Sequence, residues 1–251
     1  MRVVVLGAGV IGVTTAFYLA KRGHLVTVVD RAEAVARGAS HANAGQLAYS
    51  FTDALARPGV PRKLPGLFRG TDPAIRMRPP LEPDLLRWGL RFIGQCTSTN
   101  YRQNTTAVLP LAMQSSVLLE QLRNECEIDF AFRKAGKPVL YRSTDDLAAA
   151  ERSVDLKRGF GCRTEVLTMR EAGDVEPSLE SMREQYAGAV YSADDHLGDS
   201  RLFSIGLADA LRSRLAGQFR LGSEARALMT NGGRVSGVQL ADSVLAADSA
   251  P

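Results

Sequence analysis

The residues best suited to chemistry lie at the start of the chain, in the run Gly7-Ala8-Gly9-Val10-Ile11-Gly12. Glycine has no side chain, so backbone N–H groups in such a turn can approach a phosphate closely. Gly7 suits a tight turn, Gly9 suits the close approach of a pyrophosphate, and Gly12 lets a following helix pack on the preceding strand. Asp30 adds a carboxylate that can accept hydrogen bonds from a ribose. The pattern predicts a dinucleotide site.

The elements around the glycines are those needed to position them. Residues 2–6 are a β-branched run typical of a buried parallel strand, and residues 14–20 have helical character. Residues 25–29 read as a second strand that ends at Asp30, which completes a βαβ unit. An acid at this place would repel a 2′-phosphate, so the site favours FAD or NAD over NADP. The alternative is a glycine-rich core turn without a ligand.

Length and composition describe an ordinary globular protein. The chain has 251 residues, 45% of them hydrophobic, and a formal net charge of +4, which suits one large domain or two modest ones. The apolar run at residues 3–19 contains three glycines and precedes a strand-like segment, so a signal peptide is not predicted. No later window approaches the roughly eighteen apolar residues of a transmembrane helix.

The metal-binding and disulfide patterns do not indicate a site. The cysteines are three in number, widely spaced and without a CxxC motif, which favours a reducing cytosol over a disulfide scaffold or zinc site. The three histidines are far apart in sequence, so a metal site is not predicted. No motif in the sequence indicates nucleic-acid binding.

A small, polar segment follows the second predicted strand. Residues 37–46 are rich in serine, asparagine, glycine and glutamine and have no hydrophobic period, so they form a loop. Such a loop offers many hydrogen-bond donors with little bulk, which suits a second contact along an extended cofactor. A simple surface connection explains the same composition, and the loop alone does not separate the two.

Several motifs together resemble one family. The N-terminal block, the loop at 40–46, the run 58–61, Trp88, residues 100–101 and the run 198–203 are similar to the FAD-dependent D-amino acid oxidase and glycine oxidase family. Within it they resemble the small subunits of bacterial D-amino acid dehydrogenases. The likeness covers essentially the whole chain, as an N-terminal portion of such proteins. It implies an α/β fold: a Rossmann-type FAD-binding domain with a β-meander, plus an inserted α+β substrate domain.

The resemblance also implies a set of cofactor contacts. The loop at 40–46 would run along the ribityl chain and flavin ring of FAD, and Ala225 would lie at the adenine. The implied cofactor-binding residues are Val5, Leu6, Gly7, Ala8, Gly9, Val10, Ile11, Gly12, Asp30, Arg31, Ser40, Asn43, Ala44, Gly45, Gln46 and Ala225. The family's substrate arginine and tyrosine belong to a later segment, so no catalytic residue is assigned. We expect a truncated chain, or a partner chain that supplies the remainder.

The implied activity is FAD-dependent oxidative deamination of D-amino acids to 2-oxo acids and ammonia. Hydride would pass from the substrate Cα to flavin N5, and electrons would go on to a quinone or respiratory acceptor. The expected location is the cytoplasm, or the cytoplasmic face of the inner membrane as a peripheral protein. The alternatives are an inactive fragment with weak or no nucleotide binding, an NAD-dependent dehydrogenase, and a relative that oxidises glycine or D-hydroxyproline.

The rest of the chain reads as two further regions. We expect residues 1–52 and 199–251 to form the FAD-binding domain, and residues 53–198 to form the substrate domain. The predicted elements of the later regions are a long helix from about Ala107, strands at 137–142 and 189–191, helices capped at 143–144, 168 and 199, and a hairpin at 231–233. The long helix is expected to face a core with Leu111, Leu118, Leu119, Leu122 and Cys126. Asp199 is most simply a helix N-cap, with a substrate-side role for Asp195 or His196 as the alternative.

One stretch carries a marked positive charge. Between Arg57 and Arg102 there are nine basic residues against three acidic ones. Residues 85–93 within it form a short basic amphipathic helix with an aromatic, which could touch an anionic membrane surface or a redox partner. The interpretation we favour from the sequence is a helix packed on the core with solvated arginines.

Overall fold

The computed structural model describes residues 1–71 and 82–248, and they form two compact units. Unit 1 comprises residues 1–47, 118–135 and 196–251, and unit 2 comprises residues 48–117 and 136–195. This division differs from the expected domains in three places. Residues 48–52 were expected in the FAD-binding domain but belong to unit 2, and residues 118–135 and 196–198 were expected in the substrate domain but belong to unit 1. Leu122, Ile128 and Phe130 of the segment 118–135 are buried in the core of unit 1, which explains the difference there.

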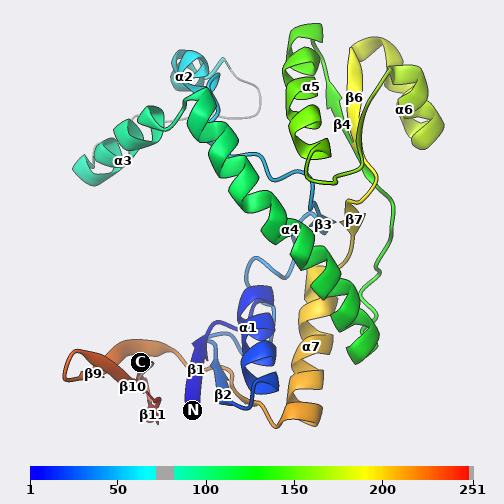
Figure 1. Cartoon of the computed structure of the whole chain (residues 1–251). Helices are drawn as coiled ribbons and strands as arrows, with labels where there is room; N and C mark the ends of the chain where they lie inside the picture. Colours follow the sequence, from blue (N-terminus) through cyan, green and yellow to red (C-terminus); the bar gives the residue numbers. More distant parts are fainter. Residues whose placement is uncertain (72–81, 249–251) are drawn as a thin grey trace. The chain divides into compact units, whose positions relative to one another are not determined.

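Unit 1 is built on the predicted βαβ unit. β1 (Arg2–Leu6) and β2 (Leu25–Val29) are parallel, and β8 (Gln218–Arg220) adds a third parallel strand beside β2. The helices α1 (Val10–Lys21) and α7 (Ser200–Leu215) pack against each other, as Figure 1 shows. Their apolar faces form one core, so the α/β prediction is confirmed.

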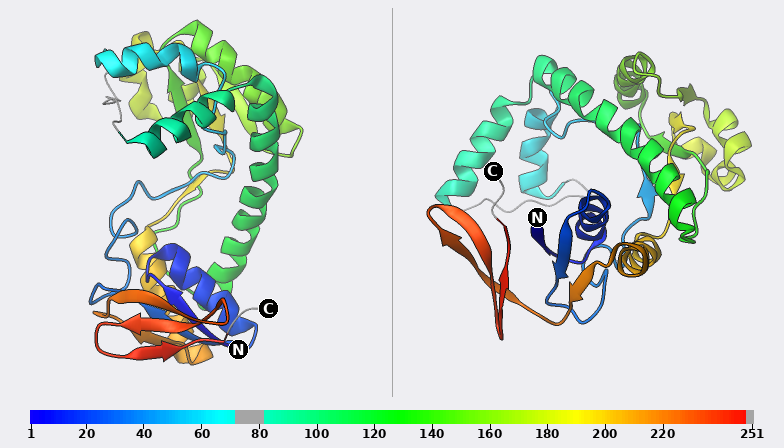
Figure 2. Two further views of the ribbon diagram at one scale, coloured as in Figure 1. Left: turned by 90° about the vertical axis from the view of Figure 1, so that its left-hand side faces the viewer. Right: turned by 60° about the horizontal axis from the view of Figure 1, so that its bottom comes forward.

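A three-stranded antiparallel meander completes unit 1. β9 (Ala225–Asn231), β10 (Arg234–Leu240) and β11 (Val244–Ala246) lie side by side in the order β11-β10-β9 (Figure 2). The predicted hairpin is confirmed, and its two glycines, Gly232 and Gly233, have positive φ angles of 60° and 77°. This left-handed backbone is the reason that glycine is needed there.

Two short contacts close unit 1. β3 (Gln46–Leu47) pairs antiparallel with β7 (His196–Leu197), which joins the polar loop to the segment before α7. After β11 the chain returns to β1, where the Asp248 N–H donates to the Arg2 carbonyl at 2.9 Å. The expected approach to a further core strand continues at residues 249–251, which lie outside the described residues.

The long helix begins earlier than predicted. α4 (Ser98–Cys126) starts nine residues before Ala107 and continues through Pro110. Its start has a cap that we overlooked, because the Thr97 hydroxyl accepts a hydrogen bond from the Asn100 N–H at 3.2 Å. Leu111 was expected to face a core, but it is 66% exposed. That expectation is wrong.

Unit 2 contains an antiparallel sheet with two capped helices. β4 (Lys137–Tyr141), β6 (Gly188–Ser192) and β5 (Thr164–Leu167) lie in the order β4-β6-β5. α5 (Thr144–Arg158) is capped by Ser143, α6 (Met169–Val175) by the predicted Thr168–Glu171 capping box, and a 3-10 helix, η1 (Pro177–Gln185), follows. The predicted strands and caps of this region are confirmed.

Two further helices of unit 2 differ from the rest. α2 (Val60–Arg69) and α3 (Pro83–Gly94) are amphipathic, yet neither contains a buried residue. The interpretation that the helix at 85–93 packs on the core is therefore wrong. Arg76 and Arg78 of the basic stretch lie outside the described residues. Within the described ranges, none of the helices combines the length and apolar character that crossing a bilayer requires.

Candidate functional site

The glycine turn has the geometry that its sequence predicts. Gly7 has a φ of 105°, a left-handed value that favours glycine, and its N–H donates to the Val29 carbonyl at 2.7 Å. A Cβ added at Gly12 would lie 1.8 Å from the Gly7 carbonyl oxygen. The helix start therefore packs directly on the turn, and no larger residue fits at Gly12 without moving the backbone.

The N-terminus of α1 is open toward solvent. Gly9 is its N-cap and offers no side-chain acceptor, and the first turn contains no acidic residue. The Ser40 hydroxyl accepts a hydrogen bond from the Val10 N–H at 2.9 Å. Ile11 is 78% exposed, which is unusual for an isoleucine. The positive end of the helix is thus available to an anion, with one polar side chain beside it.

Asp30 is fixed at the same turn. Its Oδ2 accepts from the Ala8 N–H at 2.7 Å and its Oδ1 accepts from the Ala32 N–H at 2.8 Å. The residue is only half-buried. Each carboxylate oxygen therefore keeps a lone pair for a further donor, such as a ribose hydroxyl.

Ala225 is brought to Asp30 by backbone contacts. The Ser223 N–H donates to the Asp30 carbonyl and the Gly222 N–H donates to the Ala32 carbonyl, each at 2.9 Å. β9 begins two residues after Ser223, and Ala225 is exposed there. The backbone two residues before Ala225 is thereby held at Asp30.

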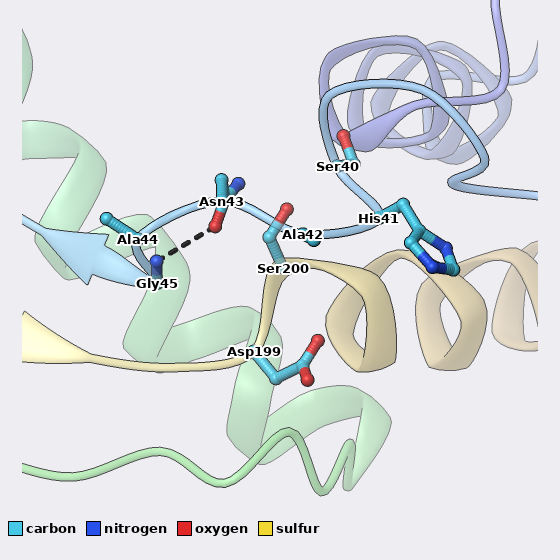
Figure 3. A pocket seen from close by; sticks show the side chains of 8 residues that line it. All are labelled: Ser40, His41, Ala42, Asn43, Ala44, Gly45, Asp199 and Ser200. Carbon is cyan, nitrogen blue, oxygen red and sulfur yellow. Dashed lines mark hydrogen bonds between the residues drawn. The ribbon is translucent and has the colours of Figure 1, made fainter.

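The polar loop lines a cavity of about 170 Å³ together with the start of α7. Asn43 shapes the loop, because its Oδ1 accepts from the Gly45 N–H at 2.9 Å. In Figure 3 the Ser200 side chain points toward this loop, whereas the Asp199 carboxylate points away from it. The residues that line the cavity are Ser40, His41, Ala42, Asn43, Ala44, Gly45, Asp199 and Ser200.

Asp199 has the capping role predicted for it. Its Oδ1 accepts from the Arg201 and Leu202 N–H groups at 2.8 and 2.9 Å. Ser200 was not among the predicted cofactor contacts, although it belongs to the run 198–203 that carries part of the family resemblance.

The remaining predicted contacts adjoin the glycine turn, Asp30 or the polar loop in sequence. Val5 and Leu6 end β1, and Leu6 is 49% exposed. Arg31 is exposed, and Gln46 is an exposed residue of β3.

Among residues 1–71 and 82–248, no three His, Cys, Asp or Glu side chains converge as they would around a metal ion.

A buried carboxylate in unit 2 has a different environment. Lys157 Nζ donates to Asp53 Oδ2 at 2.7 Å, and both side chains are 6% exposed. The hydroxyls of Ser153 and Tyr101 donate to Asp53 Oδ1. Burial alone would raise the pKa of Asp53, but the charge of Lys157 and these hydrogen bonds lower it below its ordinary value. Burial and the bond to Asp53 raise the pKa of Tyr101.

A second buried carboxylate holds the same segment of unit 2. Asp195 Oδ1 accepts from both the N–H and the hydroxyl of Ser50, at 2.9 and 2.8 Å, and both residues are 1% exposed. With Asp53, this contact fixes residues 50–53 within the unit. The sequence did not predict the Asp53–Lys157 ion pair or the hydrogen bonds between Asp195 and Ser50. The partners of each are more than a hundred positions apart.

Comparison with known proteins defines the family. The family model described as "FAD dependent oxidoreductase" matches residues 2–249. The chain belongs to this FAD-dependent oxidoreductase family. The resemblance stated from the sequence is thereby confirmed, and FAD is the cofactor of the family.

Curated relatives give the same picture. The chain is 36% identical to D-amino acid dehydrogenase 2 of Ralstonia nicotianae, over 99% of this chain and 59% of that protein. It is 39% identical to D-amino acid dehydrogenase of Allorhizobium ampelinum, over 95% of this chain and 56% of that protein. The chain therefore spans less than two thirds of the length of these relatives.

Solved structures agree on the fold. Glycine oxidase from Geobacillus kaustophilus matches with a TM-score of 0.68 at 23% identity, over 98% of this chain and 53% of that one. Glycine oxidase from Bacillus cereus matches with a TM-score of 0.65 at 19% identity, over 98% and 52%. At this identity the likeness shows the fold alone.

Proposed function

We propose that unit 1 binds the adenosine diphosphate part of FAD, as part of an FAD-dependent D-amino acid dehydrogenase. The observation that carries the proposal is the place of Asp30: its carboxylate is held at the glycine turn by the Ala8 N–H, beside an open helix N-terminus. A ribose and a pyrophosphate are neighbours in FAD, and the acceptor and the donors here are neighbours in the same way.

The residues divide the work along the cofactor. Asp30 would accept from the ribose hydroxyls, with Ala225 near the adenine. The N-terminus of α1, from Gly9 to Gly12, would face the pyrophosphate. The Ser40 hydroxyl, which now accepts from the Val10 N–H, is a group that a phosphate oxygen could replace or join.

The polar loop would serve the flavin end. Ser40, Asn43, Ala44, Gly45 and Gln46 are the proposed contacts, and four of them line the cavity that also contains Ser200. Small side chains and backbone N–H groups are suited to this role because they give donors without bulk. The remaining proposed contacts, Val5, Leu6 and Arg31, flank the turn.

The proposed reaction is oxidative deamination of a D-amino acid, with electrons passed to a quinone or respiratory acceptor. The names of the relatives support it. FAD, when bound, would accept the hydride, which carries both electrons of the oxidation, and the protein's part is binding and orientation. The relatives extend well beyond the length matched here, so no residue is assigned to the substrate.

Ligand competition tests the site. Calorimetric titration of the purified chain with FAD, ADP and FMN separates the two halves of the cofactor. We expect FAD to bind, ADP to compete with it, and FMN, which lacks the adenosine, to bind at least tenfold more weakly. Equal binding of FMN, or no binding of FAD and ADP, would overturn the site assignment.

Substrate addition tests the reaction. In the flavin-loaded protein without oxygen, D-alanine is expected to bleach the visible flavin band, while L-alanine leaves it unchanged. Bleaching by L-alanine alone would contradict the proposed substrate class. Bound flavin that neither enantiomer reduces would support the inactive alternative.

A further inference from the structure

The Ser200 side chain carries a buried polar atom that the fold does not use. Its Oγ is shielded from solvent and has no hydrogen-bond partner among the described residues. In Figure 3 this side chain points toward the polar loop, with which it lines the cavity of about 170 Å³. Buried hydroxyls in native proteins are nearly always hydrogen-bonded. The Ser200 hydroxyl is therefore available to a molecule that enters the cavity.

The backbone on both sides of this hydroxyl is held in place. The Gly198 N–H donates to the Gly45 carbonyl at 2.9 Å, and the Ser204 hydroxyl donates to the Ser200 carbonyl at 2.6 Å. A Cβ added at Gly45 would lie 2.9 Å from the Gly198 carbonyl oxygen, so the loop and the start of α7 are in close contact. A polar group on a backbone fixed in this way is positioned before any ligand arrives.

The cavity adjoins the proposed pyrophosphate site through Ser40. Ser40 lines the cavity and is only 7% exposed. Its hydroxyl accepts from the Val10 N–H of α1 at 2.9 Å and lies 3.2 Å from the place of a Cβ added at Gly9. A cofactor whose pyrophosphate lies at the start of α1 therefore has its next segment at this cavity.

The starts of α1 and α7 differ in charge. Neither the N-cap nor the first turn of α1 carries an acidic side chain, whereas the N-cap of α7 is Asp199. This carboxylate accepts from the Arg201 and Leu202 N–H groups and so offsets the positive end of α7. A phosphate is favoured at α1 and disfavoured at α7, where an uncharged oxygen can approach Ser200 instead. In FAD, the uncharged segment that follows the pyrophosphate is the ribityl chain, with the flavin ring beyond it.

We propose that the Ser200 hydroxyl binds an uncharged oxygen in the ribityl and flavin part of FAD. A hydroxyl both donates and accepts hydrogen bonds, so it matches a ribityl hydroxyl or a flavin carbonyl. An anionic ligand fits less well, because the residues that line the cavity include Asp199 and neither lysine nor arginine. The inference rests on the proposed function, since it requires FAD at the glycine turn, and it adds a contact from a different part of the chain.

Calorimetric titration with FAD and with ADP tests this contact, because ADP lacks the ribityl chain and the flavin ring. Ser200→Ala should weaken FAD binding about threefold to tenfold, as expected for the loss of one uncharged hydrogen bond, and should leave ADP binding unchanged. Ser213→Ala is the matched control. It removes an exposed hydroxyl of the same helix, which donates to the Asp209 carbonyl at 2.7 Å, and should change neither dissociation constant.

The outcomes separate this inference from the proposed function. If the unmodified chain binds neither FAD nor ADP, the proposed function fails and the inference fails with it. If it binds both, and Ser200→Ala binds FAD as tightly as the unmodified chain, the Ser200 contact alone is overturned. Equal weakening of FAD and ADP would also overturn the contact, because Ser200 would then act on the pyrophosphate site or on the fold of unit 1.

Discussion

The two units use their carboxylates in opposite ways. In unit 1, Asp30 is half-buried, accepts two backbone N–H groups, and keeps a lone pair on each oxygen. In unit 2, the Asp53 side chain is 6% exposed and is enclosed by Lys157, Tyr101 and Ser153. Asp30 can still accept hydrogen bonds from a ligand, whereas the oxygens of Asp53 already accept hydrogen bonds from side chains of unit 2.

This difference changes how a shifted pKa is interpreted. Perturbed titrating groups often mark functional sites. The pKa of the buried Asp53 is lowered, and the donors that lower it all come from its own unit. The candidate cofactor site instead depends on backbone N–H groups and on a carboxylate held by them. At Asp53 the shifted pKa therefore marks a structural clamp, whereas available backbone amides mark the proposed binding site.

The largest expected effect is at the clamp. Asp53→Ala leaves the Lys157 ammonium buried without a counter-charge, which should lower the free energy of unfolding by about 3–5 kcal/mol. Asp155→Ala, at an exposed ion pair of the same helix as Lys157, should change it by less than about 1 kcal/mol. Urea unfolding measures both. A similar small change in the two variants would show that Asp53 is not a clamp.

The glycine turn should tolerate substitution unevenly. Gly12→Ala drives a Cβ to 1.8 Å from the Gly7 carbonyl oxygen, so the backbone must move, at an expected cost of about 1–3 kcal/mol. At Gly9 the nearest atom to the added Cβ is the Ser40 hydroxyl, at 3.2 Å, which can rotate away. Gly9→Ala should therefore cost less. Thermal unfolding compares them, and equal costs would contradict the packing described for Gly12.

Acid should release the clamp of unit 2. The pKa of Asp53 is lowered in the folded chain, so the unfolded chain takes up the proton first. The stabilisation is complete above the unfolded value of about 4 and is lost as the pH falls through the lower folded value. The slope for one proton is at most about 1.4 kcal/mol per pH unit. The free energy of unfolding of Asp53→Asn, measured from pH 6 downward, should lack this pH-dependent component. A slope equal to that of the unmodified chain would contradict the role given to Asp53.

The smallest expected effect is at the cap of α7. Asp199→Ala removes the acceptor for two first-turn N–H groups and should cost about 1 kcal/mol. Asp209→Ala, within the same helix and 66% exposed at its side chain, should stay within about 0.5 kcal/mol. The melting temperatures of the two variants decide whether Asp199 acts as a cap.

Local patterns predicted the parts of the fold that local physics determines. The strand–turn–helix opening, the Thr168–Glu171 capping box and the hairpin at Gly232 depend on residues close in sequence. The Asp53–Lys157 pair depends on positions 104 residues apart, and no spacing rule anticipates it. The prediction that the helix at 85–93 packs on the core failed for a related reason. An amphipathic pattern predicts that one face of a helix is covered, but it does not identify what covers that face.

The dissociation constant of FAD for Asp30→Ala, measured beside Glu33→Ala, tests the central claim most directly. Both changes remove one carboxylate from the segment after β2, but only Asp30 is hydrogen-bonded to the glycine turn. Hydrogen bonds to a charged group contribute about 1.5–3 kcal/mol, so Asp30→Ala should weaken FAD binding about tenfold to a hundredfold. Glu33→Ala should leave it unchanged. Equal dissociation constants for the two variants would contradict the assignment of this turn to FAD.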